Sequence, residues 1–165
     1  MHRAFTLILL ILPTAAIANM VWPALYLVSG LYVWWVIVAG IAIEFIAIQR
    51  LFSLRPGRAL LVDVSANAAS AALGFILIPL AGLLYEIFPG LLVNWAFSWG
   101  TFNPVAWVAT VLLAAGINVA VEGLVMKLAF KLPLARQTKL VLYATNLATV
   151  ALAIYPMSQR LRNGA

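Results

Sequence analysis

The sequence predicts an all-α integral membrane protein: a four-helix transmembrane bundle of two tandem two-helix hairpin repeats, preceded by an N-terminal signal peptide or first helix. Of its 165 residues, 66% are hydrophobic and only 8% are charged, whereas about a quarter of the residues in soluble domains are charged. Apolar runs recur along nearly the whole chain, and several reach the ~20 residues that a helix needs to cross a ~30 Å hydrocarbon core. One compact membrane domain is therefore expected.

Four apolar stretches are long enough to cross the membrane as helices. In lipid every backbone polar group must be bonded internally, so runs of this length form helices whatever their content of β-branched residues. The expected spans cover residues 24–49, 59–85, 105–126 and 139–157.

Residues 1–18 have the layout of a secretory signal peptide. They begin with His2 and Arg3, continue through a short apolar stretch and end with the small residues Ala16 and Ala18 around one isoleucine. A basic start, an apolar middle and small residues at the end are typical of a cleaved signal. Cleavage is favoured; the alternative is an uncleaved first helix, which is short but can be accommodated where the bilayer thins.

The net charge of +6 is concentrated in two loops, one inside each hairpin. Because cytoplasmic loops are enriched in Lys and Arg, we assign both loops to the cytoplasm of a bacterial inner-membrane protein, and the inter-hairpin link and the C-terminus to the periplasm. Only Arg160 and Arg162 disagree. Nucleic acid is not expected as a partner, since it would need an exposed basic face. The basic loop residues are Arg50, Arg55, Arg58, Lys127, Lys131, Arg136 and Lys139.

The link at residues 88–104 is too aromatic for a solvated loop. It contains Trp95 and Trp99, and it is interrupted early by Pro89 and Gly90. Indole rings prefer the headgroup level of a bilayer, and Pro-Gly pairs are typical of turns. We expect the link to lie on or dip into the outer interface, and the preceding helix to end before it.

Residues 42–73 resemble residues 120–152, which predicts an internal duplication. Glu44 aligns with Glu122 and, after one extra residue in the second copy, Asn67 aligns with Asn146 and Ser70 with Thr149. Each copy is one hairpin with a basic inner loop, so a pseudo-two-fold axis along the membrane normal should relate them. The expected units are hairpin repeat 1 (19–87), the link (88–104), hairpin repeat 2 (105–157) and a periplasmic tail (158–165).

The repeated polar residues are expected to share one layer of the membrane. At 1.5 Å per residue, Glu44 and Glu122 lie roughly 9 Å inside the inner boundary and the two asparagines at roughly 10–14 Å. A carboxyl group at this depth normally faces the bundle interior with a partner. The asparagine of the same hairpin is the nearest donor, and a hydroxyl one turn further along can add to it. The candidate site comprises Glu44, Asn67, Ser70, Asn118, Glu122, Asn146 and Thr149.

Two roles for this layer remain open. The residues could latch the hairpins together, at about 0.6 kcal/mol for each interhelical hydrogen bond. They could instead form a paired site that takes up a proton or coordinates a cation. The leading hypothesis is therefore proton, cation or small-solute transport. The alternative is a non-catalytic membrane subunit or assembly factor that docks a partner membrane protein.

No enzyme activity, cofactor or metal site is predicted. The chain has no Cys, and its one histidine, His2, lies in the expected signal peptide, so thiolate or histidine metal sites and Ser-His-Asp triads cannot be assembled. Phosphate-binding and dinucleotide-binding glycine motifs are absent from the sequence. The expected partners are the lipid bilayer and either a membrane protein or further copies of the chain.

Three further residues carry separate expectations. Asp63 has no counterpart in the second repeat, and we expect it to form a salt bridge with Arg58 or Arg50 at the inner loop. Glu86 falls at the outer end of its helix and is expected to be solvated. Pro79, which has glycines on both sides, should kink the second span and open a small cavity.

Overall fold

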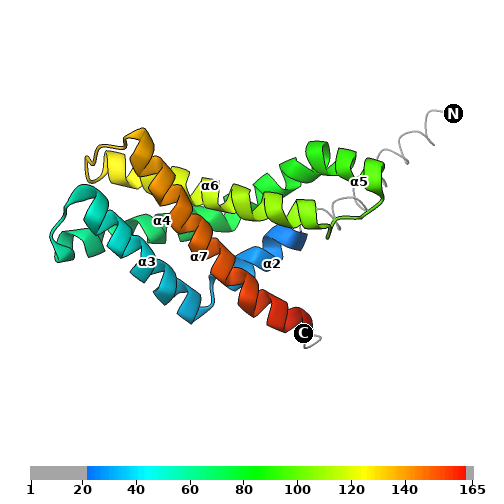
Figure 1. Ribbon diagram of the computed structural model, residues 1–165, viewed down its shortest axis with the longest axis horizontal. Helices are drawn as coiled ribbons and strands as arrows, with labels where there is room; N and C mark the ends of the chain where they lie inside the picture. The colour runs from blue at the N-terminus through cyan, green and yellow to red at the C-terminus, as the bar shows by residue number, and fades with distance from the viewer. Residues whose placement is uncertain (1–21, 163–165) are drawn as a thin grey trace, which may run out of the picture.

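The computed structural model describes residues 22–162, which contain only helices and the turns between them (Figure 1). Four helical segments in this range are long and apolar enough to cross a membrane, which confirms the predicted all-helical class. The expected signal peptide lies outside the described residues. In chain order the elements are α2 (Trp22–Leu31), α3 (Trp34–Phe52), α4 (Pro56–Tyr85), the π-helical turn η1 (Glu86–Gly90), α5 (Leu91–Phe97), α6 (Pro104–Leu128) and α7 (Arg136–Arg162).

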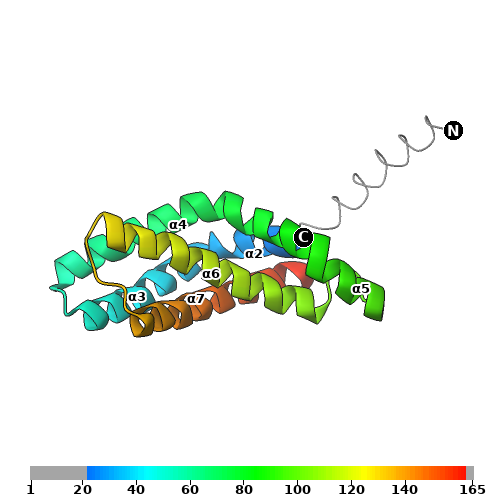
Figure 2. The ribbon, with the colours of Figure 1, turned by 90° about the horizontal axis from the view of Figure 1, so that it is seen from above.

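The long helices α3, α4, α6 and α7 form a bundle in which α3 and α6 each pack against both α4 and α7. The two basic loops, α3–α4 and α6–α7, lie at the same end of this bundle (Figure 2). The C-terminal end of α7 and the helix α5 lie at the opposite end. The helix pairs α3–α4 and α6–α7, each called a hairpin below because its two helices pack together, therefore turn at the same end of the bundle.

The first expected span, residues 24–49, is wrong as a single helix, because the chain breaks into α2 and α3. Val33 has an extended backbone, and its carbonyl accepts the N–H groups of Val36 and Ile37 at 2.9 and 3.1 Å, so that α3 begins anew there. The short helix α2 then packs against α4, α6 and α7. Leu27 of α2 has no exposed surface, so α2 fills the interior of the end that lies away from the basic loops.

The core consists of two apolar clusters separated along the bundle. One cluster includes Ile48, Val62 and Met126 near the basic loops. The other surrounds α2 and includes Leu27 and Ile78. On each long helix, buried polar residues fall between the stretches that supply the two clusters; they are Glu44, Ser70, Glu122, Asn146 and Thr149. A polar layer therefore separates two apolar regions of the bundle.

Pro89 and Gly90 do not end the second long helix, contrary to expectation. The helix continues from α4 through η1 into α5, a run of 42 residues from Pro56 to Phe97. Proline lacks an N–H group and its ring collides with the carbonyl four residues earlier. A π-helical turn shifts the bonding to five residues and so accommodates the ring. The chain then reverses in the stretch before α6, where Gly100 has a φ of 72°.

The close packing of α2 generates a test at Gly30. A Cβ atom at this position would lie 2.5 Å from the carbonyl oxygen of Ala153 in α7, and a backbone atom cannot rotate away. We expect Gly30→Ala to lower the free energy of unfolding by about 1–3 kcal/mol, measured by denaturant titration in detergent. Gly57→Ala, where a Cβ meets open space, is the control that should change little. Equal stability of the two variants would contradict the position of α2.

Candidate functional site

Glu44 and Glu122 both point into the bundle, and each is only 1% exposed. Glu44 belongs to a set of buried residues on α3 that recurs every four positions, with Gly40 before it and Ile48 after it. This spacing keeps the residues on one face of the helix. Since α3 and α6 both pack between α4 and α7, the two carboxyl groups approach those helices from opposite sides.

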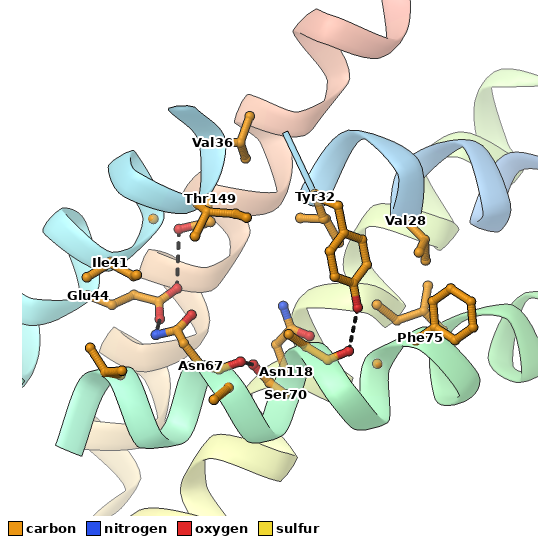
Figure 3. A pocket seen from close by; sticks show the side chains of 18 residues that line it. Val28, Tyr32, Val36, Ile41, Glu44, Asn67, Ser70, Phe75, Asn118 and Thr149 are labelled. Carbon is orange, nitrogen blue, oxygen red and sulfur yellow. Dashed lines mark hydrogen bonds between the residues drawn. The ribbon is translucent and has the colours of Figure 1, made fainter. Parts of the chain in front are cut away.

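The carboxyl group of Glu44 joins three helices (Figure 3). Its Oε2 accepts a hydrogen bond from Nδ2 of Asn67 on α4 at 2.8 Å. Its Oε1 accepts one from Oγ1 of Thr149 on α7 at 3.2 Å. The first donor belongs to the same hairpin as Glu44, whereas the second belongs to the other hairpin.

Glu122 repeats this arrangement from the other side. Its Oε2 accepts a hydrogen bond from Nδ2 of Asn146 on α7 at 2.7 Å, and its Oε1 accepts one from Oγ of Ser70 on α4 at 3.1 Å. Again the amide comes from the same hairpin and the hydroxyl from the other one. Each hydroxyl also lies 3.1 Å from a carbonyl of its own helix, that of Asn67 for Ser70 and that of Thr145 for Thr149, so its one proton is shared between its own helix and the glutamate of the other hairpin.

Each of α4 and α7 serves both glutamates through two residues that are three positions apart. On α4 these are Asn67 and Ser70, and on α7 they are Asn146 and Thr149. Residues three apart lie side by side on one helix face. The four donors and the two carboxyl groups therefore form a closed arrangement around the bundle axis, which we call the carboxyl ring.

Asp63 adds a third carboxyl group to this site, and its expected salt bridge to Arg58 or Arg50 is wrong. Its side chain has no exposed surface; Oδ1 accepts a hydrogen bond from the Asn67 amide at 2.9 Å, and Oδ2 has no partner. Five residues separate Asp63 from Arg58, which is a rotation of about 140° around a helix. The arginine therefore faces outward, where it is exposed.

The charge of this site is not balanced by a basic side chain. The seven basic loop residues are all exposed, and none of the Lys or Arg side chains described pairs with Glu44, Asp63 or Glu122. The hydrogen-bond donors are neutral amide and hydroxyl groups. Within residues 22–162, no group of three acidic or histidine side chains could hold a metal ion.

A cavity of about 280 Å³ lies beside the ring between α2, α3 and α4. Glu44, Asn67 and Thr149 line one end of it, whereas Glu122 does not line it. We expected a cavity near Pro79, Gly74 and Gly82; Gly74 and Ile78, the residue before Pro79, line this cavity, and α4 continues through Pro79. The walls contributed by α2 were not predicted, because the break before α3 was not.

Asn118 lies apart from the ring although it precedes Glu122 by one turn. It is half-buried and lines the cavity, with its Oδ1 placed 3.7 Å from where a Cβ on Gly74 would be. No hydrogen bond joins it to the ring in the part of the chain described. Of the seven predicted site residues, six meet in the ring and Asn118 extends the site into the cavity.

Glu86 is buried at 8% exposure, so its expected solvation is wrong. The helix does not end there, because it continues through η1, and the carboxyl group packs against the next turn. A Cβ on Gly90 would lie 2.7 Å from Oε2 of Glu86. Glu86 lies far from the ring along the chain and does not line the cavity.

These features define a helical bundle with four segments long enough to cross a membrane and a buried layer of carboxyl, amide and hydroxyl groups. No family model, curated protein or solved structure matches the chain. The chemistry of the ring therefore carries the functional argument.

The bond from Thr149 to Glu44 can be tested by Thr149→Val, which removes the hydroxyl and keeps the shape. We expect a loss of about 1 kcal/mol in the free energy of unfolding, and a smaller loss when Glu44→Gln is already present. Thr145→Val is the matched control on α7, because the Thr145 hydroxyl donates only to carbonyls of its own helix. Equal losses for Thr145→Val and Thr149→Val would show that the contact with Glu44 contributes nothing.

Proposed function

We propose that the protein is a small multi-pass protein of the bacterial inner membrane that transports a proton or a monovalent cation by means of the carboxyl ring. The observation that carries this proposal is the burial of three carboxyl groups whose donors are all neutral. A proton or a cation is the partner that such a cluster lacks.

A purely structural latch does not account for the acidic residues. Interhelical hydrogen bonds within membranes contribute about 0.6 kcal/mol on average, whereas an ionised side chain near the bilayer centre costs roughly 2.5–3.5 kcal/mol on insertion scales. Glutamine could make similar bonds without that cost. Three acidic residues in one layer therefore favour a role that needs their charge or their proton.

Two buried oxygen atoms extend this argument, since Oδ2 of Asp63 and Oδ1 of Asn146 have no hydrogen-bond partner. Both are acceptors, and a buried acceptor without a donor costs about 1–3 kcal/mol. A species that donates a proton or carries positive charge would satisfy them. The carboxyl ring and Asp63 beside it therefore lack both hydrogen-bond donors and positive charge.

The proposal includes an origin by duplication, in which α3–α4 and α6–α7 are the two copies. The exchanged hydroxyl bonds support it, because Ser70 and Thr149 occupy equivalent positions and bond to equivalent glutamates. The loops support it as well: Ser53 and Lys131, also equivalent, have left-handed φ values of 48° and 57°. Duplication would give the protein two similar carboxyl sites that face one another.

The proposed orientation places the basic loops in the cytoplasm and the aromatic link in the periplasm. In support, all seven basic loop residues are exposed at one end of the bundle. Exposed aromatic side chains gather around α5, beyond the opposite end; they include Trp95, at 84% exposure, and the stacked pair Phe97 and Trp99. Such rings suit a headgroup region.

This orientation can be tested by single-cysteine labelling, because the chain has no native Cys. We expect Thr101→Cys in the aromatic link to react with a membrane-impermeant maleimide in intact spheroplasts. Gly57→Cys beside the first basic loop should react only after the membrane is opened. The reverse pattern would contradict the proposed orientation.

The transport proposal is tested by Glu44→Gln and Glu122→Gln. In proteoliposomes with a trapped pH dye, we expect each variant to lower the proton flux driven by a potassium diffusion potential by about tenfold or more, because glutamine cannot exchange a proton at this site. The same vesicles are then tested with a sodium gradient. Glu86→Gln, which changes a buried carboxyl group outside the ring, is the control that should retain the flux.

Unchanged proton and cation flux in both ring variants, at normal expression, would refute the transport proposal. That result would favour the second hypothesis, a non-catalytic membrane subunit or assembly factor. A subunit should then yield one stoichiometric partner when it is purified in mild detergent.

A further inference from the structure

The cavity beside the ring has two chemically different ends (Figure 3). Glu44, Asn67, Ser70 and Thr149 form a polar end, and Asn118 lines the cavity further along, beside Gly74. The remaining walls are mostly aliphatic and aromatic side chains from α2, α3 and α4. A ligand that fits both ends must carry a polar or charged group and an apolar group.

The apolar end of the cavity opens on the outer surface of the bundle. Three of its lining residues are exposed there: Tyr32 at 48%, Ile37 at 43% and Phe75 at 62%. They lie at the α2–α3 junction and along α3 and α4, within the length of the helices that are apolar enough to span a membrane. In the proposed bilayer setting this opening faces lipid, so an apolar ligand can enter from the membrane.

Two aromatic rings stand at this opening. The hydroxyl of Tyr32 donates a hydrogen bond to the carbonyl of Ala71 at 2.6 Å, which fixes the ring between the α2–α3 junction and α4. The ring of Phe75 meets Tyr32 edge-on, with centroids 6.4 Å apart. Aromatic faces attract organic cations. Both the opening and the carboxyl end of the cavity therefore favour a positively charged ligand.

We propose that this cavity binds a small amphiphilic organic cation, a substituted ammonium that carries one apolar group, with its charge against Glu44. This inference rests on the proposed function, in which the protein transports a cation, and it specifies the chemical class of that cation. The apolar group would lie among the side chains of α2, α3 and α4. The ammonium group would supply the positive charge that the neutral donors around Glu44 do not.

Other occupants fit less well. An inorganic cation could use the oxygen atoms of Glu44, Asn67 and Ser70 at the polar end, but it would leave the apolar walls of the cavity without a ligand. A lipid chain or another neutral apolar molecule would fill the space but leave the carboxyl group of Glu44 unbalanced, and an anion would be repelled by it. A cavity of about 150 Å³ holds benzene; at about 280 Å³, this one has room for one ring and a small ammonium group.

The test uses benzyltrimethylammonium and its neutral isostere neopentylbenzene, with purified protein in nanodiscs of zwitterionic lipid. Equilibrium binding of the radiolabelled cation is measured directly, and the neutral compound is tested as a competitor. We expect the cation to bind at least about tenfold more tightly than the isostere, since charge pairing at a desolvated carboxyl group contributes strongly.

Three variants locate the site. Glu44→Gln should weaken binding of the cation by about tenfold or more, whereas Glu86→Gln, which lies outside the ring and does not line the cavity, should keep the affinity within about threefold. Gly74→Leu keeps Glu44 but fills the cavity, because a Cβ there makes only ordinary contacts at 3.4 Å. We expect it to abolish binding, and thermal unfolding of each variant verifies the fold.

The outcomes separate this inference from the transport proposal. Binding that needs the positive charge and Glu44 supports the inference even if no proton or cation flux is found, in which case the transport proposal fails alone. Normal flux without any binding of the cation overturns the inference and leaves the transport proposal intact. Equal affinity for the neutral isostere, or full binding by Glu44→Gln, also overturns the inference.

Discussion

The structure depends on the hydrogen bonds that two buried glutamates accept from α4 and α7. Glu44 and Glu122 lie on helices that are not neighbours, and each bonds to both of the helices between them. Close approach makes these bonds feasible: a Cβ on Gly40 would lie 2.6 Å from the methyl group of Thr149. The ring therefore sets the register of the hairpins at the level where the two apolar clusters are separated.

The same layer brings buried carboxyl groups close together without a basic side chain to balance their charge. Asp63 joins the layer through the amide that already bonds Glu44, so one amide nitrogen serves two carboxyl groups. The basic side chains remain in the exposed loops, at least one helical turn from the layer. A cavity reaches one carboxyl group and not the other, which makes the two halves of the ring unequal. The hydrogen bonds around the two glutamates are nearly symmetric, but the cavity reaches only Glu44.

Much of the fold and of the ring could be predicted from the sequence, because both follow from local patterns. The apolar runs predicted four spans, and the spacing of Glu44 and Asn67 across a basic loop predicted that they meet. The bonds that Ser70 and Thr149 make to the glutamate of the other hairpin were not predicted, since they depend on how the hairpins pack. The break at Val33 carries no proline, and the π-helical turn contradicts the usual effect of Pro89. The break at Val33 allows α2 to pack against α4, α6 and α7, whereas the π-helical turn accommodates the proline ring locally.

The central claim is that the carboxyl groups of the ring exchange a proton within the membrane layer. The most direct measurement is infrared difference spectroscopy of the protein in bilayers as the pH is changed, which detects the carbonyl stretch of protonated carboxyl groups. If the ring exchanges a proton, these bands change with pH. Each of Glu44→Gln and Glu122→Gln should then remove part of the change, and Glu86→Gln should keep it. Bands that do not change with pH, or that are the same in the ring variants as in the parent protein, would contradict it.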